Sequence, residues 1–260
     1  MDLGIKGRRA IVCGSSKGLG RGVAEKLAEA GVGLTLNART AETLERTAKE
    51  ISARYGVEVR TVAADVTVEA GRRLLLEAEP APDILITNAG GPPPGMWSDW
   101  DRDAWLGAID ANMLTPIMLI KSVLPGMIDR GWGRIVNITS ATVKSPVEEL
   151  GLSNAARSGL TGFVAGVARQ VARHGVVINN LLPGMHETDR IASLLQKTAS
   201  ARGMSVEEIR NEAYAANPTG RFGSPQEFGA MAAFMCSRYA GYMIGQNILL
   251  DGGAFRSTMG

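Results

Sequence analysis

The stretch Arg9-Ala10-Ile11-Val12-Cys13-Gly14-Ser15-Ser16-Lys17-Gly18-Leu19-Gly20 joins a short apolar run to a glycine-rich turn. A strand is expected over Arg9–Cys13, and apolar residues recur at helical spacing over Gly20–Ala30. Glycines in such a turn let the backbone approach a pyrophosphate, whose negative charge the helix N-terminus favours. This strand, turn and helix therefore predict a dinucleotide-binding α/β fold.

The same alternation of short apolar runs and amphipathic stretches continues along the 260 residues. It predicts a parallel sheet with helices on both faces. The further strands are expected at Gly33–Asn37, Glu58–Ala64, Asp83–Thr87, Arg134–Thr139, Val176–Leu182 and Asn247–Leu250. Neither a linker nor a repeat interrupts this rhythm, so residues 1–260 are expected to form a single domain.

Two helical stretches follow in the second half of the chain. One helix is expected from Leu152 to about Arg173. The segment 188–217 is longer than a plain connection, with helices expected at Ile191–Thr198 and Val206–Ala213. It is interpreted either as a substrate lid or as a surface excursion without a role.

The composition excludes several classes of protein. Hydrophobic residues make up 45% of the chain and charged residues 21%, as in ordinary globular proteins. A net charge of +2 is too small to indicate a nucleic-acid partner. No apolar run approaches the roughly 20 residues of a membrane span, so no membrane partner is expected. Cys13 and Cys236 lie far apart without metal-ligand spacing, which argues against a metal site and favours a reducing cytoplasm.

The glycine motif by itself is weak evidence for dinucleotide binding, and residues at the ends of other strands strengthen this evidence. Asp65-Val66 follows the third expected strand and suits an adenine, while Asn88-Ala89-Gly90 follows the fourth. Ligands bind at the carboxyl ends of strands in open α/β sheets. The cofactor contacts expected on this ground are Gly14, Ser16, Lys17, Gly18, Leu19, Gly20, Asp65, Val66, Asn88, Ala89 and Gly90.

The end of the second strand indicates which dinucleotide binds. It reads Asn37-Ala38-Arg39, without the acidic residue that would bond the ribose 2′-hydroxyl of NAD. Arg39 is instead suited to the 2′-phosphate of NADP, and Lys17 could add a second positive charge. Both could also be ordinary solvated charges, but their places favour NADP(H).

Together these motifs resemble the short-chain dehydrogenase/reductase family over essentially the whole chain. Asn112 stands in the position of the family's catalytic Asn, and Ser140 in that of its catalytic Ser. The segment Pro183–Thr188 is similar to the one that contacts the nicotinamide, which implies Pro183, Gly184 and Thr188 as cofactor contacts. The branch nearest to this pattern is that of the 3-oxoacyl-carrier-protein reductases.

The resemblance also implies architecture and partners. It implies a Rossmann-type doubly wound sheet of seven parallel strands in the order 3-2-1-4-5-6-7. It implies a homodimer or homotetramer assembled through the helix that begins near Leu152, and a small-molecule or acyl-thioester substrate. The glycines and alanines of that helix suit close helix contact.

The chain departs from the family at its YxxxK motif. Thirteen residues past Ser140 stands Ser153, and four further stands Arg157. The segment Ser153–Arg157 aligns to the motif without a gap, and no tyrosine occurs between Tyr55 and Tyr214. The family's Tyr and Lys are therefore replaced by Ser153 and Arg157.

This replacement removes the usual proton donor. The family's Tyr protonates the carbonyl oxygen, with its pKa lowered by the neighbouring Lys. Ser153 is a far weaker acid, and Arg157 holds its proton too tightly to relay it. The other candidate donors are Lys144, His186, Tyr214, or a water held by Ser140, Ser153 and Asn112.

Three functions are compatible with these residues. The first is an NADPH-dependent reductase of a carbonyl compound, for example a 3-oxoacyl thioester, with Asn112, Ser140, Ser153, Arg157 and Lys144 as candidate catalytic residues. The second is an enoyl-type reductase of an acidic or thioester substrate, gripped by Arg157. The third is a catalytically silent dinucleotide-binding protein.

Overall fold

The computed structural model describes residues 1–258, and across them seven parallel strands form one sheet in the order β3-β2-β1-β4-β5-β6-β7. This is the Rossmann-type fold and the strand order expected from the sequence. The strands are β1 Arg9–Val12, β2 Gly33–Ala38, β3 Val59–Ala63, β4 Ile84–Thr87, β5 Gly133–Ile138, β6 Val176–Pro183 and β7 Asn247–Leu250. Their ends differ from the predicted ones by one residue at most.

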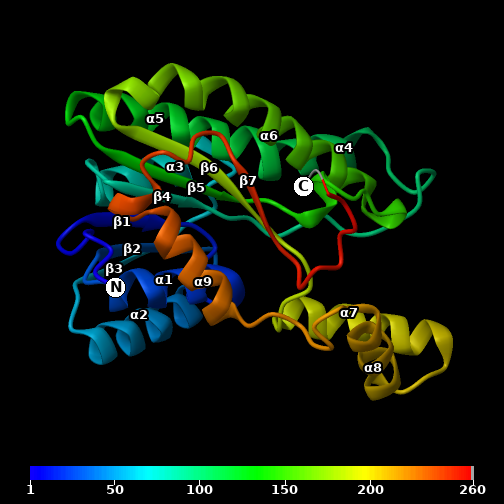
Figure 1. The fold of residues 1–260 in the computed structure, drawn as a ribbon. Coiled ribbons are helices and arrows are strands. Elements are labelled where there is room, and N and C mark those ends of the chain that lie inside the picture. The colour runs from blue at the N-terminus through cyan, green and yellow to red at the C-terminus, as the bar shows by residue number, and fades with distance from the viewer. Residues whose placement is uncertain (259–260) are drawn as a thin grey trace.

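Helices cover both faces of the sheet (Figure 1). The α-helices are α1 Gly18–Glu29, α2 Ala41–Tyr55, α3 Glu69–Ala78, α4 Arg102–Ile109, α5 Thr115–Asp129, α6 Gly151–Val171, α7 Asp189–Arg202, α8 Val206–Ala216 and α9 Pro225–Met235. A π-helical turn, Asp110–Leu114, joins α4 to α5. Short 3-10 turns lie at Ala141–Val143, Glu148–Leu150, Ala172–His174 and Arg238–Ala240.

Alternating strand residues feed two separate apolar cores. Val12, Leu36 and Ile86 point to one face, where α1, α2 and α9 pack. Ile11 and Leu85 point to the other face, where α3, α5 and α6 pack. This period of two along buried parallel strands is why the runs read as continuously apolar in the sequence.

The helical stretch Arg102–Asp129 is long and apolar enough, by length and composition alone, to cross a membrane. The sequence reading did not single it out, because polar residues such as Asp110 and Lys121 interrupt its apolar runs. Half of its most apolar window is buried inside the protein, with Ile120 and Met127 in the core beside the sheet. A core helix has this composition because it packs on one side against strands and on another against neighbouring helices.

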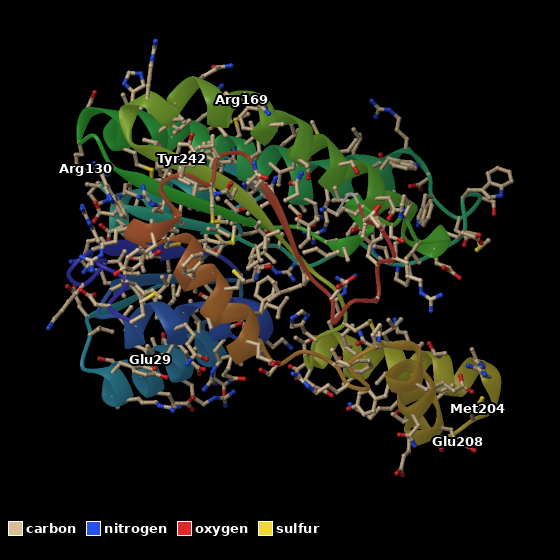
Figure 2. The ribbon with its side chains drawn as sticks, in the orientation of Figure 1. Glu29, Arg130, Arg169, Met204, Glu208 and Tyr242 are labelled. Carbon is tan, nitrogen blue, oxygen red and sulfur yellow. The ribbon has the colours of Figure 1, made fainter. Side chains whose placement is uncertain are left out.

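Helices α7 and α8 project from the carboxyl end of the sheet as a separate small layer (Figure 1). Both are longer than expected from the sequence, and Met204 and Glu208 lie on this part of the molecule (Figure 2). The pair has an apolar core of its own, built from Leu195, Ala199, Ile209 and Phe222. Met185 and Met204 pack against that core.

Candidate active site

The glycine turn lies where the strand order reverses, between β1 and β4. Gly14 and Gly18 have φ angles of +57° and +58°, which favour glycine. A Cβ on Gly20 would lie 2.2 Å from the carbonyl oxygen of Gly14, so this position has no space for a side chain. Asn88 Nδ2 donates to the same carbonyl at 3.1 Å, which ties the end of β4 to the turn.

The backbone around this turn fits a dinucleotide. No atom lies within 4 Å of the place where Gly90 would carry a Cβ, so open space adjoins the segment after β4. Ser16 and Leu19 lie in the turn, where the Ser16 carbonyl accepts from Thr47 Oγ1 and Leu19 packs on the core. Open backbone at a topological switch point is the usual setting of a pyrophosphate.

The residues expected near the adenosine end lie beside the ends of β2 and β3. Arg39 is exposed and lies near Asp65, where its charge contributes to lowering the pKa of that carboxyl. The larger cause is hydrogen bonding, since Thr67 donates its backbone N–H and its hydroxyl to Asp65 Oδ1. Val66 accepts from Arg72 through its carbonyl oxygen. Arg39 is thus free to turn toward a phosphate.

Lys17 lies in the glycine turn and forms an ion pair with α7. Its Nζ pairs with Asp189 Oδ2 at 2.9 Å, and both side chains are largely exposed. The first turn of α7 therefore contacts the glycine turn directly. Thr188 caps α7 by accepting from the backbone N–H of Ile191, and its methyl group adjoins Gly18.

The segment after β6 reaches the same edge of the sheet. Pro183 is the last residue of β6, and the Gly184 N–H donates to Leu250 of β7. A Cβ on Gly184 would lie 2.6 Å from that of Asp251. The close approach of β6 and β7 fixes where Pro183, Gly184 and Thr188 can meet a ligand.

Asn112 lies in the π-helical turn and is buried. Its Nδ2 donates to the Ala108 carbonyl at 3.4 Å, while its Oδ1 has no hydrogen-bond partner among the described residues. A buried amide oxygen without a donor is costly, and π-turns of this kind are frequent at functional sites. The geometry leaves this oxygen available to a bound water or ligand.

Ser140 caps the 3-10 turn that follows β5. Its Oγ accepts from the backbone N–H of Thr142 at 3.2 Å and from the Thr142 hydroxyl at 3.0 Å. Because both of these contacts use lone pairs of Ser140, its own hydroxyl proton remains free to be donated. Lys144 ends the same turn, is half-buried, and forms no ion pair within residues 1–258.

Ser153 and Arg157 share the buried side of α6, one turn apart. Arg157 is only 7% exposed and donates to two carbonyl oxygens, from Nη1 to Ile138 at 2.9 Å and from Nη2 to Ala89 at 3.4 Å. Burial and, to a smaller extent, the charge of Arg190 together lower the pKa of Arg157 to about 10. The structure therefore brings Arg157 to the segment after β4, with Ser153 on the same buried side of α6.

The sequence reading missed Arg190. This residue lies in the first turn of α7 and reaches back over Gly91, donating from Nη2 to the Pro92 carbonyl at 3.4 Å. One signal could have found it: a cation in the first turn of a helix opposes the helix dipole. An arginine at such an unfavourable position is therefore a candidate for a binding role.

His186 and Tyr214, two of the candidate proton donors, are engaged elsewhere. His186 is buried, its Nδ1 contacts the Gly184 carbonyl, and its ring packs edge-on against Phe228. Burial lowers the pKa of His186. Tyr214 donates to Glu187 and packs on Phe222 within the α7–α8 layer. Among the described residues, neither side chain is hydrogen-bonded to Ser140, Ser153 or Arg157.

Within residues 1–258 no group of three or more His, Cys, Asp and Glu side chains could hold a metal ion. Both cysteines are free and buried, and burial raises the pKa of each thiol to about 12. Buried thiols with such a pKa are inert.

Residues 14–254 match a family model described as "Enoyl-(Acyl carrier protein) reductase". The chain is 32% identical over 260 residues to the 3-oxoacyl-(acyl-carrier-protein) reductase FabG of Aquifex aeolicus, covering 98% of this chain and 100% of the relative. The structure of L-sorbose reductase from Gluconobacter frateurii with NADPH and L-sorbose aligns with a TM-score of 0.94 at 27% identity, covering 99% and 100% of the two chains. An actinorhodin polyketide ketoreductase variant with NADPH aligns with a TM-score of 0.88 at 31% identity, covering 95% and 97%.

Proposed function

The chain belongs to the short-chain dehydrogenase/reductase family, in the branch similar to FabG, and we propose that it is an NADPH-dependent reductase of a carbonyl compound with an atypical proton donor. A 3-oxoacyl thioester is one candidate substrate. The observation that carries the proposal is that Arg157 donates to the carbonyls of Ile138 and Ala89, which ties the face of α6 that carries Ser153 to the end of β5, two residues before Ser140, and to the segment after β4.

Ser140, Arg157 and Asn112 each have a role in this proposal. Ser140 donates a hydrogen bond from its hydroxyl to the carbonyl oxygen and so stabilises the charge that develops there. Arg157 binds and orients groups at the segment after β4, and Asn112 holds a water through its unpartnered Oδ1. The cofactor, when bound, supplies the hydride from C4 of its nicotinamide.

Lys144 is our candidate for the proton donor. It is half-buried, follows Ser140 by four residues and has no ion-pair partner among the described residues. The water held by Ser140, Ser153 and Asn112 is the alternative. A positioned general acid is typically worth ~10²–10⁴-fold in rate, so Lys144→Met distinguishes the two by a loss of that order or by none.

The preference for NADPH rests on Arg39 and on the lack of an acidic residue at the end of β2. The two structures described above, which contain NADPH, support it. The similarity to FabG and the two free, buried thiols support a cytoplasmic enzyme. A homodimer or homotetramer through α6 is proposed because Gly162 and Gly166 are exposed there with no atom near.

Single-turnover oxidation of bound NADPH tests the function, using acetoacetyl thioesters with a panel of ketones and enones across pH. Oxidation by carbonyl compounds supports the proposal, and the apparent pKa of the rate reports the proton donor. Oxidation only by enones would instead support an enoyl-type reductase, in keeping with the family model's description. Tight NADPH binding without oxidation by any compound would contradict both and leave a binding protein.

A further inference from the structure

Two guanidinium groups donate hydrogen bonds to the segment that follows β4. Arg157 reaches it from α6 and donates to the Ala89 carbonyl, whereas Arg190 reaches it from α7 and donates to the Pro92 carbonyl. The two charges are close enough that Arg190 lowers the pKa of Arg157. Two cations from different elements thus converge on four residues of backbone.

The fold makes room for this approach at Gly91. A Cβ there would lie 2.2 Å from Nη1 of Arg190, so any larger residue would displace the guanidinium. The guanidinium of Arg190 therefore packs directly against the backbone at Gly91.

Neither arginine has a counter-charge. Among residues 1–258 no carboxylate forms an ion pair with either guanidinium, although two acids flank Arg190 in the sequence. Glu187 pairs with Arg210 and accepts from Tyr214, and Asp189 pairs with Lys17. Both acids are turned away from Arg190 by these contacts.

Such an arrangement is unfavourable without a ligand. Burying a charge without a partner is costly, and Arg157 is more than nine-tenths buried. Arg190 adds like-charge repulsion and sits at the end of α7 whose dipole disfavours a cation. An anion placed between the two groups would offset all three costs.

We propose that Arg157 and Arg190 together bind a carboxylate of the substrate, so that the enzyme reduces a carbonyl compound that carries its own acid group. This rests on the proposed carbonyl reduction and narrows its substrate class. Ser153 lies one turn from Arg157, a separation of roughly 5–6 Å between Cβ atoms. In the proposed function the reacting carbonyl lies beside Ser140 and Ser153. A carboxylate bound at Arg157 is therefore only a few bonds from that carbonyl, as in a small oxo acid.

Matched acids and esters test the proposal with NADPH-loaded protein. Pyruvate and acetoacetate are compared with methyl pyruvate and methyl acetoacetate in kcat/KM. We expect each acid to exceed its ester by at least tenfold, and Arg190→Met to reduce this ratio to near one. Arg190→Lys keeps the charge but loses the planar fork, so it should retain an intermediate ratio.

Arg202→Met is the matched control, because it removes an exposed guanidinium from the far end of the same helix. It should leave the acid-to-ester ratio unchanged. Equal rates for acids and esters in the wild type would overturn the proposal. So would an Arg190→Met variant that binds NADPH more weakly but keeps the ratio, because the anion would then belong to the cofactor.

A binding measurement keeps the two proposals separate. Calorimetric titration of each acid and its ester into NADP⁺-saturated protein reports the anion site without turnover. Tighter binding of the acid, lost in Arg190→Met, supports the carboxylate site even if no compound is reduced. Equal binding of acid and ester overturns it, whatever the outcome for carbonyl reduction.

Discussion

Arg157 carries a full charge into a buried site whose neighbours are neutral carbonyl groups and a second cation. An unliganded protein gains little from such a residue, because two hydrogen bonds to carbonyls offset only part of the lost hydration. The buried charge therefore lowers the free energy of unfolding of the unliganded protein. Binding of an anion or of the cofactor would offset this cost.

Replacing Arg157 by Met should consequently stabilise the free protein. We expect a gain of about 1–2 kcal/mol at neutral pH, seen as a rise in Tm of about 2–6 °C. Burial lowers the pKa of Arg157 to about 10, so the folded state disfavours its charged form at all pH values below that. The advantage of the variant should narrow as the pH rises through 10. Thermal unfolding of both proteins at pH 7 and pH 11 measures this, and a lower Tm for the variant at pH 7 would contradict it.

Arg39 offers a separate test of cofactor choice. Arg39→Gln removes the cation that follows β2, so we expect about a tenfold rise in KM for NADPH with little change for NADH. Arg46→Gln, on the exposed side of α2, serves as the control. Steady-state kinetics with both cofactors distinguishes them. A parallel loss with NADPH and NADH would mean that Arg39 does not contact the 2′-phosphate.

The predictable part of the site consists of residues held by backbone motifs. Ser153 and Arg157 could be placed on one buried face because the spacing i, i+4 fixes their relation on a helix. Arg190 could not be placed, because its contact with Gly91 joins residues about a hundred positions apart. Lys17 could be placed in the glycine turn, whereas its pairing with Asp189 could not be predicted, because it depends on where α7 docks.

At the scale of elements, the unit formed by β1, the glycine turn and α1 depends on the close approach of Gly20 to the Gly14 carbonyl. Gly20→Ala places a Cβ against the Gly14 carbonyl, so either the turn or the start of α1 must shift. We expect a loss of about 1–3 kcal/mol in stability and at least a tenfold loss in NADPH affinity. Gly107→Ala, in α4 with open space around it, should instead gain about 0.5–1 kcal/mol. Denaturant unfolding and NADPH fluorescence titration check both, and unchanged NADPH affinity in Gly20→Ala would show that the turn does not bind the cofactor.

Strands β1, β4 and β6 were predictable because they are buried on both faces and read as apolar runs bounded by polar residues or glycine. The π-helical turn at Asp110–Leu114 was not, since its hydrogen bonding depends on packing between α4, α5 and α6 rather than on residue type. The functional consequence is the position of Asn112. The sequence allowed Asn112 to be matched to the position of the family's catalytic Asn. That its Oδ1 lacks a hydrogen-bond partner among the described residues could be found only from the structure.

At the scale of the whole molecule, the apolar core of α7 and α8 is distinct from the two cores that flank the sheet. The layer touches the cofactor side through Lys17–Asp189 and through Arg190. A separate apolar core, joined to the rest of the molecule mainly through the ends of the segment, where Asn217 Nδ2 also donates to the Asp251 carbonyl, favours a segment that opens without unfolding the sheet. We therefore propose 188–217 as a substrate lid on one Rossmann domain.

Ile209→Ala tests this proposal, because Ile209 is 5% exposed and belongs to the core of α7 and α8. Its truncation should cost about 2–5 kcal/mol, confined to that layer. Native-state hydrogen exchange should then show faster exchange for amides of α7 and α8, with β4 and β5 unchanged, and KM for the substrate should rise. Val164→Ala, in the core between α6 and the sheet, is the matched truncation and should accelerate exchange in the strands as well. Equal acceleration of lid and strands by Ile209→Ala would show that α7 and α8 unfold together with the sheet, and a lid that opens by itself would have to be abandoned.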